Sequence, residues 1–164
     1  MKANAKKETI YANIIMLAVF FFAFLGTEYL FDNCMMYVTD ASGVVRAQNQ
    51  MLGVSAIGFL LYNWISGFLA DKSPWVTGGT GLLAFGVGAG CMGCIILHAG
   101  YVQMMIAGGV LFFLLGVLGA GVHYRMAYSV YDRAMLARCV GFAYAGGIFL
   151  QFLNNNMIHE NHTQ

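Results

Sequence analysis

The chain has 164 residues, of which 60% are hydrophobic and only 9% are charged. A soluble domain carries roughly a quarter of its residues charged, so this composition excludes a soluble globular fold and indicates a membrane protein in contact with the lipid bilayer. The formal net charge of +1 excludes a nucleic-acid partner, because the chain has no excess of basic side chains to neutralise phosphates.

Five apolar segments each approach the roughly 20 residues that a helix needs to cross the hydrocarbon of a bilayer. These segments must be helices, because the edge of an open sheet leaves backbone groups unsatisfied in lipid. The sequence therefore predicts an all-α polytopic membrane protein with a single transmembrane domain over residues 1–164. The expected helices cover about 13–38, 51–70, 75–97, 102–124 and 138–158.

The first segment contains two carboxylates, Glu28 and Asp32, which are four residues apart and so share one helix face. Glu28 lies about 22 Å along a helix that begins near Asn13. A carboxylate in the hydrocarbon costs at least ~2.5 kcal/mol and normally faces a cavity or a partner. We expect Glu28 and Asp32 to contact a solute or a coupling ion, and the alternative is a structural hydrogen bond to a neighbouring helix.

Other polar or small side chains inside the apolar segments can join helices. Asn63 and Gln151 are neutral amides, which either tie membrane helices together, at about 0.6 kcal/mol on average, or hydrogen-bond a solute. They are further candidates for substrate or ion contact. Gly86 and Gly90, in the glycine-rich third segment, have the spacing that allows close helix contact.

The cysteines and histidines do not form a metal-binding pattern. Cys91 and Cys94 are a Cys-x-x-Cys pair inside an apolar run, without the second Cys or His pair that a zinc site needs. His98 and His123 stand alone at helix ends on opposite sides of the predicted bundle. They therefore cannot share one metal or haem, whose ligands must converge at one depth. Neither a Ser/His pair at matching depth nor a His-Glu-x-x-His helix is present. We therefore expect no metal, no cofactor and no enzymatic activity.

The basic residues predict the orientation. Positive loops stay on the cytoplasmic side, and seven of the eight Lys and Arg residues fall on one side of the predicted bundle, with only Arg46 on the other. The N-terminus is therefore expected in the cytoplasm and the C-terminal tail outside the cell inner (plasma) membrane. The seven residues are Lys2, Lys6, Lys7, Lys72, Arg125, Arg133 and Arg138.

Two connections carry a recognisable pattern. Gly67, Asp71 and Lys72 form Gly-x-x-x-Asp-Lys between the second and third predicted helices, and Arg138 precedes Gly141 by three residues at the start of the fifth. In spacing and setting, these passages resemble the N-terminal half of the major facilitator superfamily of transporters. The chain keeps the first half of that family's loop signature, and "PWV" stands where the family has a glycine and basic residues.

The resemblance implies the first five helices of a twelve-helix fold, which a C-terminal half or self-association would complete. The first and fourth helices would line a central cavity. Glu28 and Asp32 would there contact a small-molecule solute, with H+ as an optional coupling ion.

The resemblance also implies a gating motif on the cytoplasmic side. Asp71 would pair with Arg125 or Arg138 and hold that side closed, in a contact that breaks when the transporter opens inward. The full motif comprises Gly67, Asp71, Lys72, Arg125, Arg138 and Gly141.

The expected function is therefore secondary active transport of a small solute. No Gly-x-x-x-x-Gly-Lys-(Ser/Thr) loop is present for coupling to ATP. The alternative is a non-transporting interaction or assembly subunit, which would stabilise a membrane complex through its glycine-rich helices.

Overall fold

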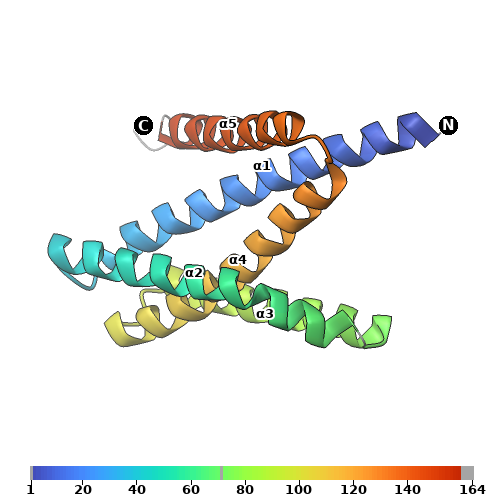
Figure 1. Ribbon diagram of the computed structural model, residues 1–164. Helices are drawn as coiled ribbons and strands as arrows, with labels where there is room; N and C mark the ends of the chain where they lie inside the picture. Colours follow the sequence, from blue (N-terminus) through green and yellow to red (C-terminus); the bar gives the residue numbers. More distant parts are fainter. Residues whose placement is uncertain (1, 71, 160–164) are drawn as a thin grey trace. The chain divides into compact units, whose positions relative to one another are not determined.

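The computed structural model describes residues 2–70 and 72–159 and shows them as long helices joined by short turns, with no strand among them (Figure 1). The prediction of an all-α polytopic protein is confirmed, because five helical stretches are long and apolar enough to cross a membrane: Glu8–Met35, Ala41–Ala70, Val76–Ile96, Tyr101–Ser129 and Arg133–Asn156. The helices are α1 (Lys2–Met35), α2 (Ala41–Ala70), α3 (Pro74–Ile96), α4 (Tyr101–Ser129) and α5 (Arg133–His159).

Helix α2 begins at Ala41 rather than at Met51 as predicted, and Asp40 explains the difference. The Asp40 carboxylate accepts hydrogen bonds from the Ser42 hydroxyl and from the Gly43 backbone N–H, each at 2.9 Å. An aspartate in this position satisfies backbone donors that have no partner in the first helical turn. The hydrogen bonds from Ser42 and Gly43 also hold the pKa of the Asp40 carboxyl below its usual range.

Helix α5 likewise begins earlier than predicted, at Arg133. Asp132 caps it, since its Oδ1 accepts a hydrogen bond from the Ala134 N–H at 3.1 Å. Helix α4 continues to Ser129, so the long polar connection expected between these two helices shrinks to residues 130–132. In both connections, polar residues that resemble a loop are helical. They form either the capped first turn of the following helix or an extension of the preceding helix.

The chain forms two compact units, and the first comprises Met1–Thr27 with Gly121–Gln164. In this unit α5 lies directly against α1 at Gly147. A Cβ added to Gly147 would come within 2.7 Å of the Phe21 Cβ and 2.9 Å of the Ala18 carbonyl oxygen. Only glycine therefore allows the two helices to approach this closely. In the first half of α1, Asn13 Nδ2 donates a hydrogen bond to Ser129 Oγ, at the end of α4, at 2.7 Å.

The second unit, Glu28–Ala120, is held together by close packing of α2 on α4. A Cβ at Gly116 would overlap the Ser55 carbonyl, and a Cβ at Gly58 would overlap the Phe113 carbonyl. The two backbones therefore touch without intervening side chains, as small residues allow in membrane helices. The end of α1 completes this core, because Phe31 packs edge-to-face on Phe112 of α4 with ring centroids 5.8 Å apart.

The glycines of α3 pack differently from the prediction. Gly88 meets Leu111 and Leu114 of α4 at ordinary contact distance. Gly86 and Gly90, for which close helix contact was expected, have no described atom within 4 Å of the position a Cβ would take. The same holds for most of the other α3 glycines. Gly79 and Gly93 share a helix face with Gly86 and Gly90, so this side of the helix is open in the described chain. The open positions are Gly78, Gly79, Gly81, Gly86, Gly90 and Gly93.

Two turns of the second unit meet each other. The Tyr37 ring, after α1, contacts the His98 ring, after α3, in a tilted arrangement with centroids 4.5 Å apart. His98 and Gly100 have φ values of 50° and 110°, which reverse the chain between α3 and α4. The α1–α2 and α3–α4 turns therefore lie at the same end of this unit, as expected for helices that cross a membrane in alternating directions.

Candidate functional site

A carboxylate–amide pair joins α1 and α2 within the second unit. Gln48 Nε2 donates a hydrogen bond to Glu28 Oε1 at 2.8 Å, in a partly buried position. The sequence pattern predicts a connecting loop at Gln48, so this residue is not among the predicted site residues. The cap at Asp40 places it instead in the second turn of α2, where its side chain reaches α1. Asp40, as a helix-capping residue in the sequence, is the feature that indicates a helical position for Gln48.

Asp32 lies one turn beyond Glu28 on the same helix. Its Oδ1 is buried and has no hydrogen-bond partner among the described residues. A buried acceptor in this state costs about 1–3 kcal/mol. The site is therefore stabilised by any group that brings a proton, a positive charge or a hydrogen-bond donor to this oxygen.

Glu28, Asp32 and Gln48 together form the candidate site, which we call the acidic cluster. Its two carboxyl groups are acceptors when ionised, and Gln48 already uses one of its donors on Glu28. Such a cluster suits a proton, a cation or a solute rich in N–H or O–H groups, and disfavours an anion. Among the described residues, no three His, Cys, Asp or Glu side chains are grouped as a metal site would need.

The structure does not bring Asn63 into the acidic cluster. Asn63 follows Gln48 on the same helix at a distance of about 22 Å along the axis, and it is exposed. Its backbone carbonyl accepts a hydrogen bond from Ser66 Oγ at 3.1 Å. Asn63 therefore lies at a different depth from the Glu28–Gln48 pair.

Gln151 belongs to the first unit, where it takes part in helix packing. Its Nε2 donates to Asn155 Oδ1 at 3.2 Å, one turn further along α5. Its Oε1 is buried without a hydrogen-bond partner among the described residues and faces Gly26 of α1, 3.5 Å from the position a Cβ would take there. The amide thus fills the space that a glycine leaves between α1 and α5.

His123 does not stand alone, contrary to the prediction. Its Nε2 lies 2.7 Å from the Tyr144 hydroxyl, which joins α4 to α5 in the first unit. The rings of Phe20 and Phe21, on α1, meet the imidazole edge-to-face with centroids 6.3 and 6.4 Å away. Nothing in the sequence pairs His123 with Tyr144, because each is an isolated polar group in an apolar helix.

The gating motif is divided between the two units. Gly67 and Lys72 belong to the second unit, and Arg125, Arg138 and Gly141 to the first. Asp71 lies outside the described residues, so its pairing with an arginine stays a prediction. Arg125 and Arg138 are exposed, and Lys72 Nζ lies 4.9 Å from the centroid of the Phe68 ring.

The fold defines an all-α, multi-pass membrane protein. Comparisons with models of known protein families, with curated proteins and with solved structures give no match.

Proposed function

We propose that this chain is the N-terminal portion of a secondary transporter of small solutes, similar to the major facilitator superfamily. The observation that carries the proposal is the acidic cluster: Glu28 is held by Gln48 at 2.8 Å, and Asp32 Oδ1 is buried beside it with no hydrogen-bond partner among the described residues. Carboxylates within membrane helices mark solute or proton pathways by default, since their burial is costly.

In this proposal the cluster binds either a cationic solute or a solute together with H+. Gln48 fixes one oxygen of Glu28, which leaves the other oxygen and Asp32 to accept a proton or a solute donor. Binding satisfies the buried Asp32 oxygen, so occupied and empty clusters differ in free energy. A transporter shifts between two states when the cluster binds its ligand more tightly in one state than in the other.

The remaining parts of the proposal follow the transporter analogy. A C-terminal half or a second copy supplies the other wall of the pathway. The N-terminus, with its basic residues, lies on the cytoplasmic side of the plasma membrane. Asp71 pairs with Arg125 or Arg138 to close the cytoplasmic side, and Asp71→Asn then changes the rate of solute uptake.

The test is solute-induced flux in proteoliposomes during a screen of small solutes, with an internal pH dye to report protons and a membrane-potential dye to report a cationic solute. Glu28→Gln removes the charge but keeps an acceptor for Gln48, and we expect the flux to fall at least about tenfold, as for loss of an essential proton-binding group. Glu8→Gln, at an exposed position of the same helix, is the matched control and leaves flux unchanged. Equal flux in the parent and in Glu28→Gln refutes the role of the acidic cluster.

A second function, assembly of a membrane complex, is favoured by the open side of α3. Glycines spaced for close helix contact that have no described neighbour suit a helix from another chain. Under this alternative, Gly86→Leu and Gly90→Leu prevent association, as measured by cross-linking in native membranes. Gly53→Leu, at an open glycine of α2, does not. An assembly subunit also gives no solute flux of its own.

A further inference from the structure

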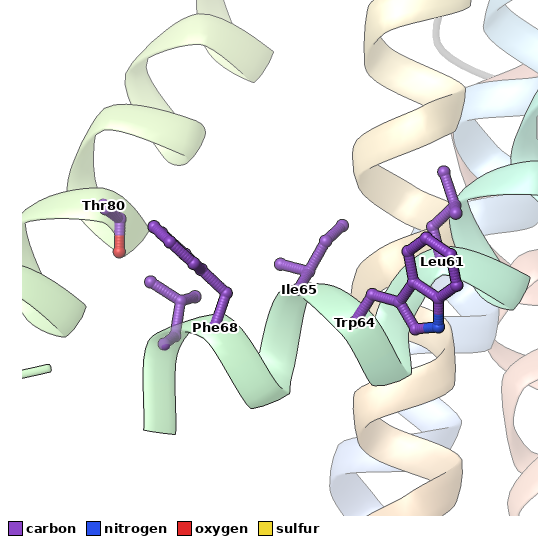
Figure 2. Close-up of a pocket in the computed structure, with 6 residues that line it drawn as sticks. Leu61, Trp64, Ile65, Phe68 and Thr80 are labelled. Atoms are coloured by element: carbon purple, nitrogen blue, oxygen red, sulfur yellow. The ribbon is translucent and has the colours of Figure 1, made fainter. Parts of the chain in front are cut away.

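A groove of about 500 Å³ lies between α2 and α3 in the second unit (Figure 2). Figure 2 shows its side chains in a row along the last turns of α2, with Phe68 at the end nearest to Thr80 of α3. The groove is open to the side rather than enclosed, since Trp64 is 78% and Phe68 is 70% exposed. Its lining is Leu61, Trp64, Ile65, Phe68, Leu69 and Thr80.

The groove offers a surface that is mostly hydrocarbon. Its polar groups are the Trp64 indole N–H and the Thr80 hydroxyl, which donates to the Thr77 carbonyl at 2.9 Å, within α3. Both helices that form the groove are apolar enough to cross a membrane. A polar ligand would lose its hydration here and gain at most a hydrogen bond from the indole, so the groove suits an aliphatic chain.

A cation lies at one end of this groove. Lys72 Nζ is 4.9 Å from the centroid of the Phe68 ring, which is part of the lining. Lys72 follows the end of α2 and precedes α3, so it lies between two membrane-crossing segments, where the chain reaches the membrane surface. The hydrocarbon groove therefore leads to a positive charge at headgroup level.

We propose that this groove binds an anionic phospholipid, with one acyl chain along Trp64 and Phe68 and the phosphate at Lys72. A partner helix fits the groove less well, because close helix contacts in membranes need small residues, whereas Trp64, Ile65 and Phe68 are bulky. A flexible acyl chain adapts to such an uneven surface. Basic groups beside membrane helices add roughly a fivefold preference for anionic lipid per residue. The site does not depend on solute transport.

The test uses the fluorescence of Trp64, one of the two tryptophans of the chain. With Trp75→Phe as background, the full chain is reconstituted in vesicles that contain increasing fractions of dibrominated phosphatidylglycerol or of dibrominated phosphatidylcholine. Bromine quenches a tryptophan that it touches. We expect half-maximal quenching at an about fivefold lower fraction of the anionic lipid.

Substitutions at the cation separate a specific site from general lipid contact. Lys72→Gln removes the preference and leaves quenching by both lipids, whereas Lys72→Arg retains the preference. Arg46→Gln, an exposed cation near the other end of α2, is the control and changes neither curve. Retention of the preference in Lys72→Gln overturns the proposal.

Two results with the parent chain also overturn it. Equal quenching by the two lipids shows ordinary contact with the bilayer and no anionic site. An absence of quenching by both lipids shows that protein, either a second copy or another chain, covers Trp64.

Discussion

The imidazole Nε2 of His123 lies 2.7 Å from the hydroxyl of Tyr144, and this contact links α4 to α5. Whichever group donates the proton, each satisfies the other in an apolar setting that contains Phe20 and Phe21. Either group alone would be a polar atom in a largely apolar environment, so the two helices are stabilised as a pair.

Tyr144→Phe removes the hydroxyl and keeps the ring. We expect a loss of about 1 kcal/mol in the free energy of unfolding, the usual net worth of an intramolecular hydrogen bond. The measurement is unfolding in mixed micelles with increasing denaturing detergent. Tyr128→Phe, at an exposed tyrosine of α4, is the control, and an equal effect of the two substitutions contradicts a specific His123–Tyr144 bond.

The contact of α2 with α4 at Gly116 predicts a cost for a single methyl group. Gly116→Ala forces a Cβ into the Ser55 carbonyl, so the backbones must separate, and we expect a destabilisation of about 1–3 kcal/mol. Gly109→Ala, on the same helix but with no described atom within 4 Å, should be neutral or slightly stabilising, since alanine favours helix. Similar unfolding curves for the two variants argue against the close contact.

The Glu28–Gln48 hydrogen bond predicts an energetic coupling between two helices. In a double-mutant cycle of Glu28→Ala and Gln48→Ala, we expect an interaction term near 0.6 kcal/mol and at most about 1.7 kcal/mol, the range of such bonds in membrane proteins. The control cycle combines Glu28→Ala with Asn49→Ala, at the exposed neighbour of Gln48, and gives additive effects. Additivity in both cycles means that the Glu28–Gln48 pair does not form.

Asp40 predicts a pH dependence at the start of α2. Because hydrogen bonds from Ser42 and Gly43 lower its pKa in the folded chain, its contribution to stability is complete above the usual aspartate pKa. That contribution is lost as the pH falls through the lowered value. The Gly43 amide resonance should therefore titrate below the usual aspartate range. Asp40→Asn keeps an effective cap and abolishes the titration, and a titration that persists in this variant assigns it to another group.

The existence of the helices could be predicted from the sequence, because long apolar runs have few alternatives in a bilayer. Their starts could not be predicted by composition, since Asp40 and Asp132 stand in polar stretches that look like loops. The side-chain hydrogen bonds of these two residues convert the following residues into helix. Weighting cap residues more heavily than polarity would have recovered both boundaries.

The partner of each candidate residue was harder to predict than the residue itself. Glu28 and Asp32 were evident as charges in an apolar run, but the role of Gln48 depends on how α2 is rotated against α1. The contacts of the glycines were also not predictable from the sequence. Gly58 and Gly116 contact a neighbouring backbone, whereas Gly86 and Gly90 meet none in the described part of the chain. Spacing alone does not show which helix face meets another helix.

Helices α2 and α3 differ in length, with 30 and 23 residues, which correspond to about 45 Å and 35 Å. The hydrocarbon layer is about 30 Å thick, so α2 exceeds it far more than α3 does. A longer helix fits by tilting or by extending above the hydrocarbon. Bilayer thickness therefore acts unequally on two helices of one unit: a thicker membrane lets α2 stand more upright while α3 has little tilt to give up.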